Sequence, residues 1–169
     1  RWEVLEPHRR DTFTVGVLGL GVLGAHVAQA VAAFGMPVRG YSRSARQIDG
    51  ITTFAGDAQF DAFLNGVKVL VNLLPHTPDT GDVLNRHTFS KLAKGAYLIN
   101  VARGKLVNEA DLVRALAEGR IAGAGLDVFV DEPNVPPALF DMDQVTLQAH
   151  RASATEEVPV KCALSQYIG

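Results

Sequence analysis

The sequence has little of what marks a secreted or membrane-embedded protein. Its single cysteine, Cys162, excludes a disulfide within the chain and suits a reducing compartment, so we expect a cytoplasmic protein. Residues 1–11 are polar and of mixed charge, unlike a signal peptide. Glycine or polar residues interrupt every apolar run well before the roughly 20 residues that a membrane helix needs. We therefore expect no membrane contact.

The sequence also lacks an excess of charge of one sign. It carries 16 basic and 18 acidic residues for a net charge of −2, with no basic run, which gives no reason to expect a nucleic-acid partner. Its histidines show no metal-ligand spacing, and we predict no metal site. With 169 residues, 47% of them hydrophobic, the chain is long enough for one domain with a real core.

A glycine-rich turn lies between a predicted strand and a predicted helix. The apolar residues 14–18 lead into Gly19-Leu20-Gly21-Val22-Leu23-Gly24, and the helix-forming residues 25–34 follow. This G-x-G-x-x-G order is typical of dinucleotide binding: Gly19 permits the tight turn, Gly21 lets a pyrophosphate approach, and Gly24 lets the helix pack closely. The helix start offers N–H groups and a positive dipole end to the phosphates. A turn that binds nothing is the alternative interpretation.

The segment after the second predicted strand, residues 36–41, indicates which dinucleotide binds. Proteins that prefer NAD usually place Asp or Glu about 20 residues beyond the glycines, to bind the ribose hydroxyls. Here Ser42, Arg43 and Ser44 occupy that place, and no carboxylate follows until Asp49. A missing acid removes repulsion against a 2′-phosphate, and the guanidinium of Arg43 can bind one. We predict NADPH as the preferred cofactor and NADH as a second one; a solvated polar loop is the alternative.

Predicted strands alternate with predicted helices along the chain. Further strands are expected at residues 50–54, 67–74, 96–101, 122–129 and 144–147, with helices at 59–64 and 108–118. This alternation predicts an α/β fold with a doubly wound, Rossmann-type parallel sheet. Ligands of such sheets bind beyond the carboxyl ends of the strands. The residues expected at that edge are Ser42, Arg43, residues 75–80, Ala102, Arg103, Asp127 and His150.

Several motifs resemble the D-isomer-specific 2-hydroxyacid dehydrogenases. They are Asn100-Val101-Ala102-Arg103-Gly104, residues 109–112, residues 119–129 and Glu132-Pro133, within a resemblance that extends from about Trp2 to His150. Residues 41–44, 73–78 and 95–100 are most similar to the bacterial glyoxylate/hydroxypyruvate reductases that prefer NADPH. The resemblance implies reduction of a small 2-keto acid to the D-2-hydroxy acid.

The resemblance also implies the catalytic residues Arg103, Glu132 and His150. Arginine can bind a substrate carboxylate with two parallel hydrogen bonds, and histidine, with an ordinary pKa of about 6.5, can protonate the forming alkoxide. Glu132 would orient the imidazole and favour its protonated form. A surface arginine, a polar loop glutamate and a histidine without a catalytic role are the alternatives. Ala149 stands before His150 where the family has proline.

The cofactor site implied by the motifs and the resemblance combines five parts of the chain. Asp127 would receive the nicotinamide carboxamide, although a plain strand-end role is the alternative, and His76 lies at the same edge. The predicted cofactor-binding residues are Gly19, Gly21, Val22, Leu23, Gly24, Ser42, Arg43, Ser44, Leu74, Pro75, Thr80, Val101, Ala102, Arg103 and Asp127.

The resemblance predicts how the chain relates to a two-domain enzyme. Residues 1–13 would be an interdomain connection, residues 14–150 the dinucleotide-binding domain, and residues 151–169 the start of a helix that returns to a substrate domain largely absent from this sequence. It also implies a homodimer formed through this domain. A non-catalytic dinucleotide sensor or corepressor-like scaffold of the same fold is the alternative function.

Overall fold

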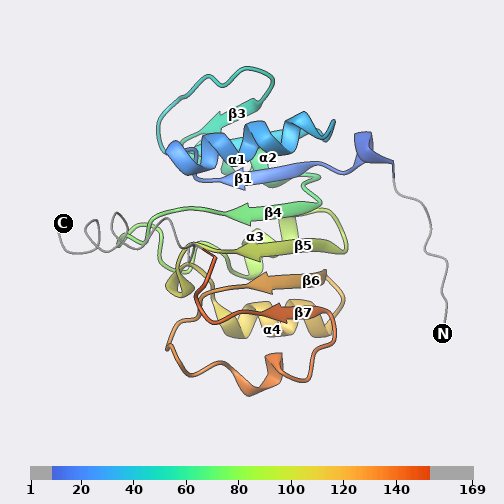
Figure 1. Cartoon of the computed structure of the whole chain (residues 1–169), viewed down its shortest axis with the longest axis vertical. Coiled ribbons are helices and arrows are strands. Elements are labelled where there is room, and N and C mark those ends of the chain that lie inside the picture. The colour runs from blue at the N-terminus through green and yellow to red at the C-terminus, as the bar shows by residue number, and fades with distance from the viewer. Residues whose placement is uncertain (1–8, 153–169) are drawn as a thin grey trace.

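A seven-stranded parallel sheet forms the centre of the molecule. The computed structural model describes residues 9–152, and the strands follow the order β3-β2-β1-β4-β5-β6-β7 (Figure 1). The strands are β1 (Val15–Leu18), β2 (Val38–Ser42), β3 (Thr52–Ala55), β4 (Val69–Asn72), β5 (Ala96–Asn100), β6 (Ile121–Leu126) and β7 (Val145–Leu147). This architecture confirms the predicted Rossmann-type α/β fold.

Four α-helices cover the sheet, with α1 in front of it in Figure 1 and the other three behind. They are α1 (Val22–Ala33), α2 (Phe60–Leu64), α3 (Arg86–Lys91) and α4 (Glu109–Ala117), and the short 3-10 turns are η1 (Arg10–Thr12), η2 (Asp57–Gln59), η3 (Gly104–Leu106) and η4 (Pro137–Leu139). None of the helices in the described part of the chain is long and apolar enough to cross a membrane.

Two clusters of buried side chains hold these layers together. The smaller one contains Val17, Ala28 and Val38 and joins α1 to β1 and β2. The larger one contains side chains from α2, α3 and α4, among them Phe63 and Phe89, packed on the other face of the sheet. Continuous apolar strands such as β4 are explained by this burial on both faces.

Helix α3 is the element that the sequence pattern did not predict. Its six residues are too few to display a helical period of apolar residues. Its start is instead defined by Asn85, whose side-chain oxygen accepts hydrogen bonds from the N–H groups of His87 and Thr88 at 2.9 and 3.3 Å. Asparagine before a helix is therefore the signal that could have located it.

Two strands differ most from their predicted ranges. In place of residues 67–74 the structure has Val69–Asn72, and in place of residues 122–129 it has Ile121–Leu126. In both cases the apolar run continues past the last paired residue into a loop at the carboxyl edge. Residues 153–169, where the returning helix was expected, and residues 1–8 lie outside the described residues, so the domain boundaries stay a prediction.

Candidate active site at the carboxyl edge of the sheet

The glycine-rich turn between β1 and α1 has the geometry of a phosphate-binding turn. Gly19 has φ of 106°, and a Cβ at Gly24 would lie 1.8 Å from the carbonyl oxygen of Gly19. A Cβ at Gly21 would instead meet no described atom within 4 Å, so space is open beside the first turn of α1. No side chain caps this helix start among the described residues. The residues present therefore fit a pyrophosphate group held by helix N–H groups.

A hollow of about 300 Å³ joins this turn to the loop after β2. Its lining includes Gly21, Arg43, Ser44 and Arg46. The hydroxyl of the buried Ser42 donates a hydrogen bond to the carbonyl oxygen of Ser44 at 2.8 Å and so fixes the turn of this loop. The site prediction left out Arg46, although a second arginine three positions after Arg43 is visible in the sequence.

The loop after β4 closes the same hollow and is folded by Thr80. The Thr80 hydroxyl donates to the carbonyl oxygen of Pro75 at 2.9 Å and accepts a hydrogen bond from the N–H of Thr77 at 2.8 Å. Leu74, Pro75 and Thr80 line the hollow. Thr80 therefore shapes the loop that presents Leu74 and Pro75.

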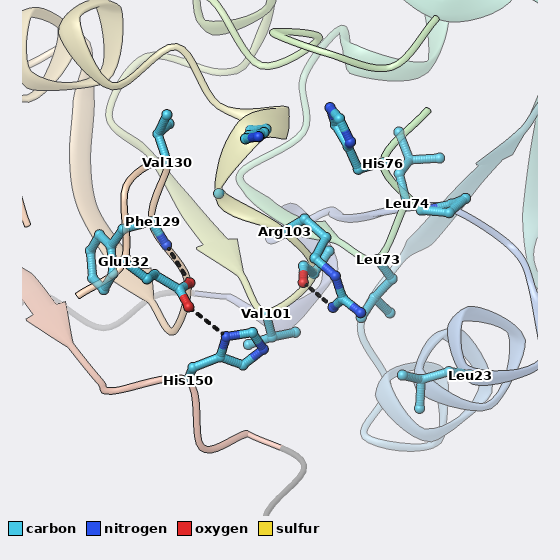
Figure 2. A pocket seen from close by; sticks show the side chains of 14 residues that line it. Leu23, Leu73, Leu74, His76, Val101, Arg103, Phe129, Val130, Glu132 and His150 are labelled. Carbon is cyan, nitrogen blue, oxygen red and sulfur yellow. Dashed lines mark hydrogen bonds and ion pairs between the residues drawn. The ribbon is translucent and has the colours of Figure 1, made fainter. Parts of the chain in front are cut away.

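A larger cleft of about 740 Å³ lies at the carboxyl edge, and Figure 2 shows the side chains around it. It is built by residues that follow β4, β5, β6 and β7, together with the start of α1. Its lining residues are Leu23, Leu73, Leu74, Pro75, His76, Val101, Ala102, Arg103, Gly104, Lys105, Phe129, Val130, Glu132 and His150. The three predicted catalytic residues therefore surround one cleft, which also includes Leu23 beside the glycine-rich turn.

Not every predicted site residue lines these two hollows. The smaller one contains Gly19, Gly21, Ser42, Arg43, Ser44 and Thr80, and the cleft contains Leu23, Val101, Ala102, Arg103, Glu132 and His150. Val22, Gly24 and Asp127 line neither of them. Val22 is 80% exposed at the start of α1, and Gly24 packs against the turn itself.

Glu132 and His150 form a hydrogen-bonded pair on one side of the cleft. Nδ1 of His150 lies 2.8 Å from Oε2 of Glu132, while Oε1 of Glu132 accepts the Phe129 N–H at 3.0 Å (Figure 2). The hydrogen bond from His150, more than any other contact, lowers the pKa of Glu132 below its ordinary value of 4.5. Because Nδ1 is engaged, the other ring nitrogen, Nε2, is left for a ligand in the cleft.

Arg103 projects into the cleft from the loop after β5 (Figure 2). Its Nη1 donates to the carbonyl oxygen of Ala102 at 2.7 Å, and its other donors face the cleft side. A Cβ at the next residue, Gly104, would lie 1.9 Å from backbone atoms of Phe129. Glycine at this position therefore allows the loop that leads to Glu132 to lie directly against the loop that carries Arg103.

A buried pair of asparagines, missed by the site prediction, supports two of these loops. Nδ2 of Asn72 donates to Oδ1 of Asn100 at 3.0 Å, and both side chains are fully buried. Asn72 also accepts the N–H of Leu74, and Asn100 donates to the carbonyl oxygen of Arg103. The signal in the sequence is an asparagine at the end of two apolar strands, where a buried amide needs partners.

Asp127 contacts the chain around His150. Its Oδ1 accepts the Arg151 N–H at 2.7 Å, its Oδ2 accepts the Ala152 N–H at 2.8 Å, and its backbone carbonyl accepts the His150 N–H at 2.8 Å. The residue is only 3% exposed. Its predicted contact with a nicotinamide carboxamide stays a prediction.

Comparison with known proteins assigns the chain to a family. Residues 1–152 match the model of the NAD-binding domain of the D-isomer specific 2-hydroxyacid dehydrogenases. The chain is 53% identical over 156 residues to glyoxylate/hydroxypyruvate reductase A of Serratia proteamaculans, an alignment that covers 91% of this chain and 50% of the relative. The chain thus spans about half the length of the curated relatives it matches.

Solved structures show the same likeness. A D-isomer specific 2-hydroxyacid dehydrogenase of Xanthobacter autotrophicus, crystallised with NADPH and MES, superposes with a TM-score of 0.90 at 40% identity and covers 98% of this chain and 69% of that one. The NADPH-dependent glyoxylate/hydroxypyruvate reductase of Sinorhizobium meliloti, in complex with NADP and sulfate, gives 0.88 at 38% identity, covering 98% and 54%. This chain therefore belongs to the D-isomer specific 2-hydroxyacid dehydrogenase family, matching its NAD-binding domain.

Proposed function

We propose that the whole protein reduces a small 2-keto acid, such as glyoxylate or hydroxypyruvate, to the D-2-hydroxy acid with NADPH. The observation that carries this proposal is the convergence of Arg103, Glu132 and His150 on one cleft beside the glycine-rich turn. These are a carboxylate-binding cation, a proton donor and the acid that orients it, which is the set of groups that this reduction needs.

The residues of the glycine-rich turn and of the loop after β2 would hold the cofactor. Its pyrophosphate would lie against the N–H groups at the start of α1, and Arg43 and Arg46 would bind the 2′-phosphate. The relatives solved with NADPH or NADP support this choice over NADH. When bound, the nicotinamide supplies the hydride for the reaction.

The chain's own side chains would then position and protonate the substrate. The guanidinium of Arg103 would bind the substrate carboxylate and draw the keto oxygen toward His150. Nε2 of the protonated His150 would donate its proton to the oxygen as the hydride reaches the carbon, giving the hydroxyl group. Glu132 holds Nδ1 throughout, so the ring keeps its direction as its charge is lost.

A screen of the full-length protein tests the proposal. NADPH oxidation, followed by absorbance, is measured with glyoxylate, hydroxypyruvate, phenylpyruvate and further small 2-keto acids. Turnover of at least one of them is expected. If the protein binds NADPH tightly and reduces none of these acids, the non-catalytic sensor of the same fold is the better description.

Replacing His150 tests its role as proton donor. In the full-length protein, His150→Ala is expected to lower kcat about 100-fold or more, because the proposed mechanism takes the proton from this imidazole. Binding of NADPH should be retained, since His150 lies across the cleft from the phosphate turn. Retention of most of kcat would remove His150 from the mechanism.

Changing Arg103 to lysine tests the carboxylate contact. A lysine ammonium is a point charge and cannot form two parallel hydrogen bonds with a carboxylate. Arg103→Lys should therefore lower kcat/KM for the keto acid about tenfold or more. An unaltered kcat/KM in steady-state kinetics would refute this role.

Arg43→Ala tests the choice of cofactor. Loss of the guanidinium should weaken binding of NADPH and leave binding of NADH nearly unchanged, because only NADPH carries the 2′-phosphate. Fluorescence titration of the two cofactors measures this. An unchanged NADPH/NADH preference would contradict the assignment of Arg43.

We also propose that the protein is a homodimer, on the ground of its family alone. Sedimentation equilibrium of the full-length protein measures the mass directly. A monomer at micromolar concentration would contradict the proposal.

A further inference from the structure

We propose that Asp127 is the positioning residue of the catalytic loop: its carboxylate anchors the backbone after His150 and so sets the direction of the imidazole. This inference rests on the proposed function of His150 as proton donor. It gives Asp127 a task distinct from the carboxamide contact that the family resemblance implies.

The contacts of Asp127 reach three successive residues. Its backbone carbonyl accepts the N–H of His150, and its two carboxylate oxygens accept the N–H groups of Arg151 and Ala152 at 2.7 and 2.8 Å. One residue at the end of β6 therefore holds the whole backbone that follows β7 at this point. Hydrogen bonds to an ionised carboxylate are stronger than those between neutral groups.

The backbone of His150 needs such an anchor. Its φ is 52°, in the left-handed region that residues other than glycine rarely adopt. Such a conformation persists only where the surrounding structure holds it. Since Asp127 fixes the chain on the carboxyl side of His150 while Glu132 fixes the ring at Nδ1, the two acids together determine where Nε2 lies.

The burial of Asp127 is compatible with a task inside the loop. The residue is only 3% exposed, and it does not belong to the described residues that line the cleft. Each of its carboxylate oxygens already has a backbone donor. A carboxamide would have to displace one of these donors or share an oxygen with it.

The test is Asp127→Asn in the full-length protein. Asparagine keeps the shape of the side chain, but its NH₂ group replaces one of the two oxygens that accept hydrogen bonds from the backbone N–H groups of Arg151 and Ala152. One of these two hydrogen bonds is therefore lost. We expect kcat to fall about tenfold or more, the Kd of NADPH to stay within about twofold, and the fall to appear in kcat more than in KM. The matched control is Asp143→Asn, which removes the same charge from an exposed turn and should leave kcat unchanged.

A cofactor analogue separates the two roles of Asp127. The 3-acetylpyridine analogue of NADPH lacks the NH₂ donor of the carboxamide. If Asp127 anchors the loop, the ratio of wild-type to Asp127→Asn kcat is the same with NADPH and with the analogue. A ratio that falls to about one with the analogue, or a Kd of NADPH raised about tenfold at unchanged kcat, would overturn the proposal.

Hydrogen–deuterium exchange provides a readout that does not depend on turnover. In the wild-type protein the peptide covering residues 148–152 should be protected, and in Asp127→Asn it should exchange faster while peptides of β4 and β5 stay protected. Protection that is equal in both proteins would overturn the anchor. This measurement needs no substrate, so it tests the role of Asp127 even if the wild-type protein is inactive. Inactivity of the wild-type protein would contradict the proposed function only.

Discussion

At the scale of single residues, Glu132 illustrates how one side chain can serve two contacts. Its Oε1 accepts the N–H of Phe129, which fixes the direction of the carboxylate, and its Oε2 meets Nδ1 of His150. The hydrogen bond from His150 lowers the pKa of Glu132. The acid therefore keeps its negative charge to a lower pH than an ordinary glutamate.

A pH dependence of stability follows from the lowered pKa of Glu132. A carboxyl group whose pKa is lower in the folded than in the unfolded state stabilises folding above its ordinary value of 4.5, and this contribution is lost as the pH falls through the lowered value. Glu132→Gln should thus reduce the free energy of unfolding by about 0.5–1 kcal/mol at roughly pH 6, because the pair is partly exposed.

Urea unfolding of both proteins at several pH values measures this difference. It should shrink as the pH falls through the lowered pKa of Glu132, because the protonated acid resembles the amide. A difference that grows as the pH falls would contradict the sign derived from the hydrogen bond.

At the scale of elements, the turn between β1 and α1 contains one glycine that is needed for packing and another that borders open space. Gly24 lets α1 lie against the turn, since a Cβ there would collide with the carbonyl oxygen of Gly19. Gly21 borders open space at the start of the helix. Two glycines three residues apart are therefore expected to serve different purposes: Gly24 is required by the fold, and we propose that Gly21 leaves room for the ligand.

Alanine at each of these glycines should show that difference. Gly24→Ala is expected to lower the free energy of unfolding by about 1–3 kcal/mol, because the added carbon must push α1 away from the turn. Gly21→Ala should leave unfolding nearly unchanged and weaken NADPH binding, because its Cβ would occupy the space proposed for the pyrophosphate. Chemical unfolding and fluorescence titration measure the two effects; equal losses of stability would refute the distinction.

At the scale of the whole molecule, the proposed catalytic residues lie at one edge of the sheet. The cleft of about 740 Å³ lies along the edge of the sheet, and the chain spans about half the length of its curated relatives. Hydride transfer is favoured when closure of a second domain excludes water and completes the substrate site. These residues are the basis for proposing cofactor binding and proton donation.

The 169-residue chain, produced by itself, should accordingly bind NADPH and turn over poorly. We expect its Kd for NADPH to lie within about tenfold of that of the full-length protein, because the phosphate-binding turn is complete in it. Its kcat should be lower by about 100-fold or more, since no second domain excludes water. Equal kcat values for the two proteins would show that these residues alone form the whole active site.

Much of this fold was predictable because its signals are local. The glycine pattern, the apolar strands and the helix-forming segments each lie within a few consecutive residues, and all of them lead to the observed sheet. Helix α3 was missed because six residues show no helical period, and Arg46 because no local pattern distinguishes it from a solvated loop residue. The end of β4 was placed too late because the apolar residues Leu73 and Leu74 continue past the last pairing.

The sequence by itself determined the alternation of strands and helices and the tight turn at Gly19, and its motifs carried the family resemblance that predicts three catalytic side chains. Tertiary structure alone decided which groups meet: Asn72 with Asn100, Glu132 with His150, and Asp127 with the backbone of residues 150–152. The physical reason is that hydrogen bonds depend on distances of about 3 Å between atoms. Such distances between residues far apart in the chain are set only when the parallel strands bring their carboxyl ends to one edge of the sheet.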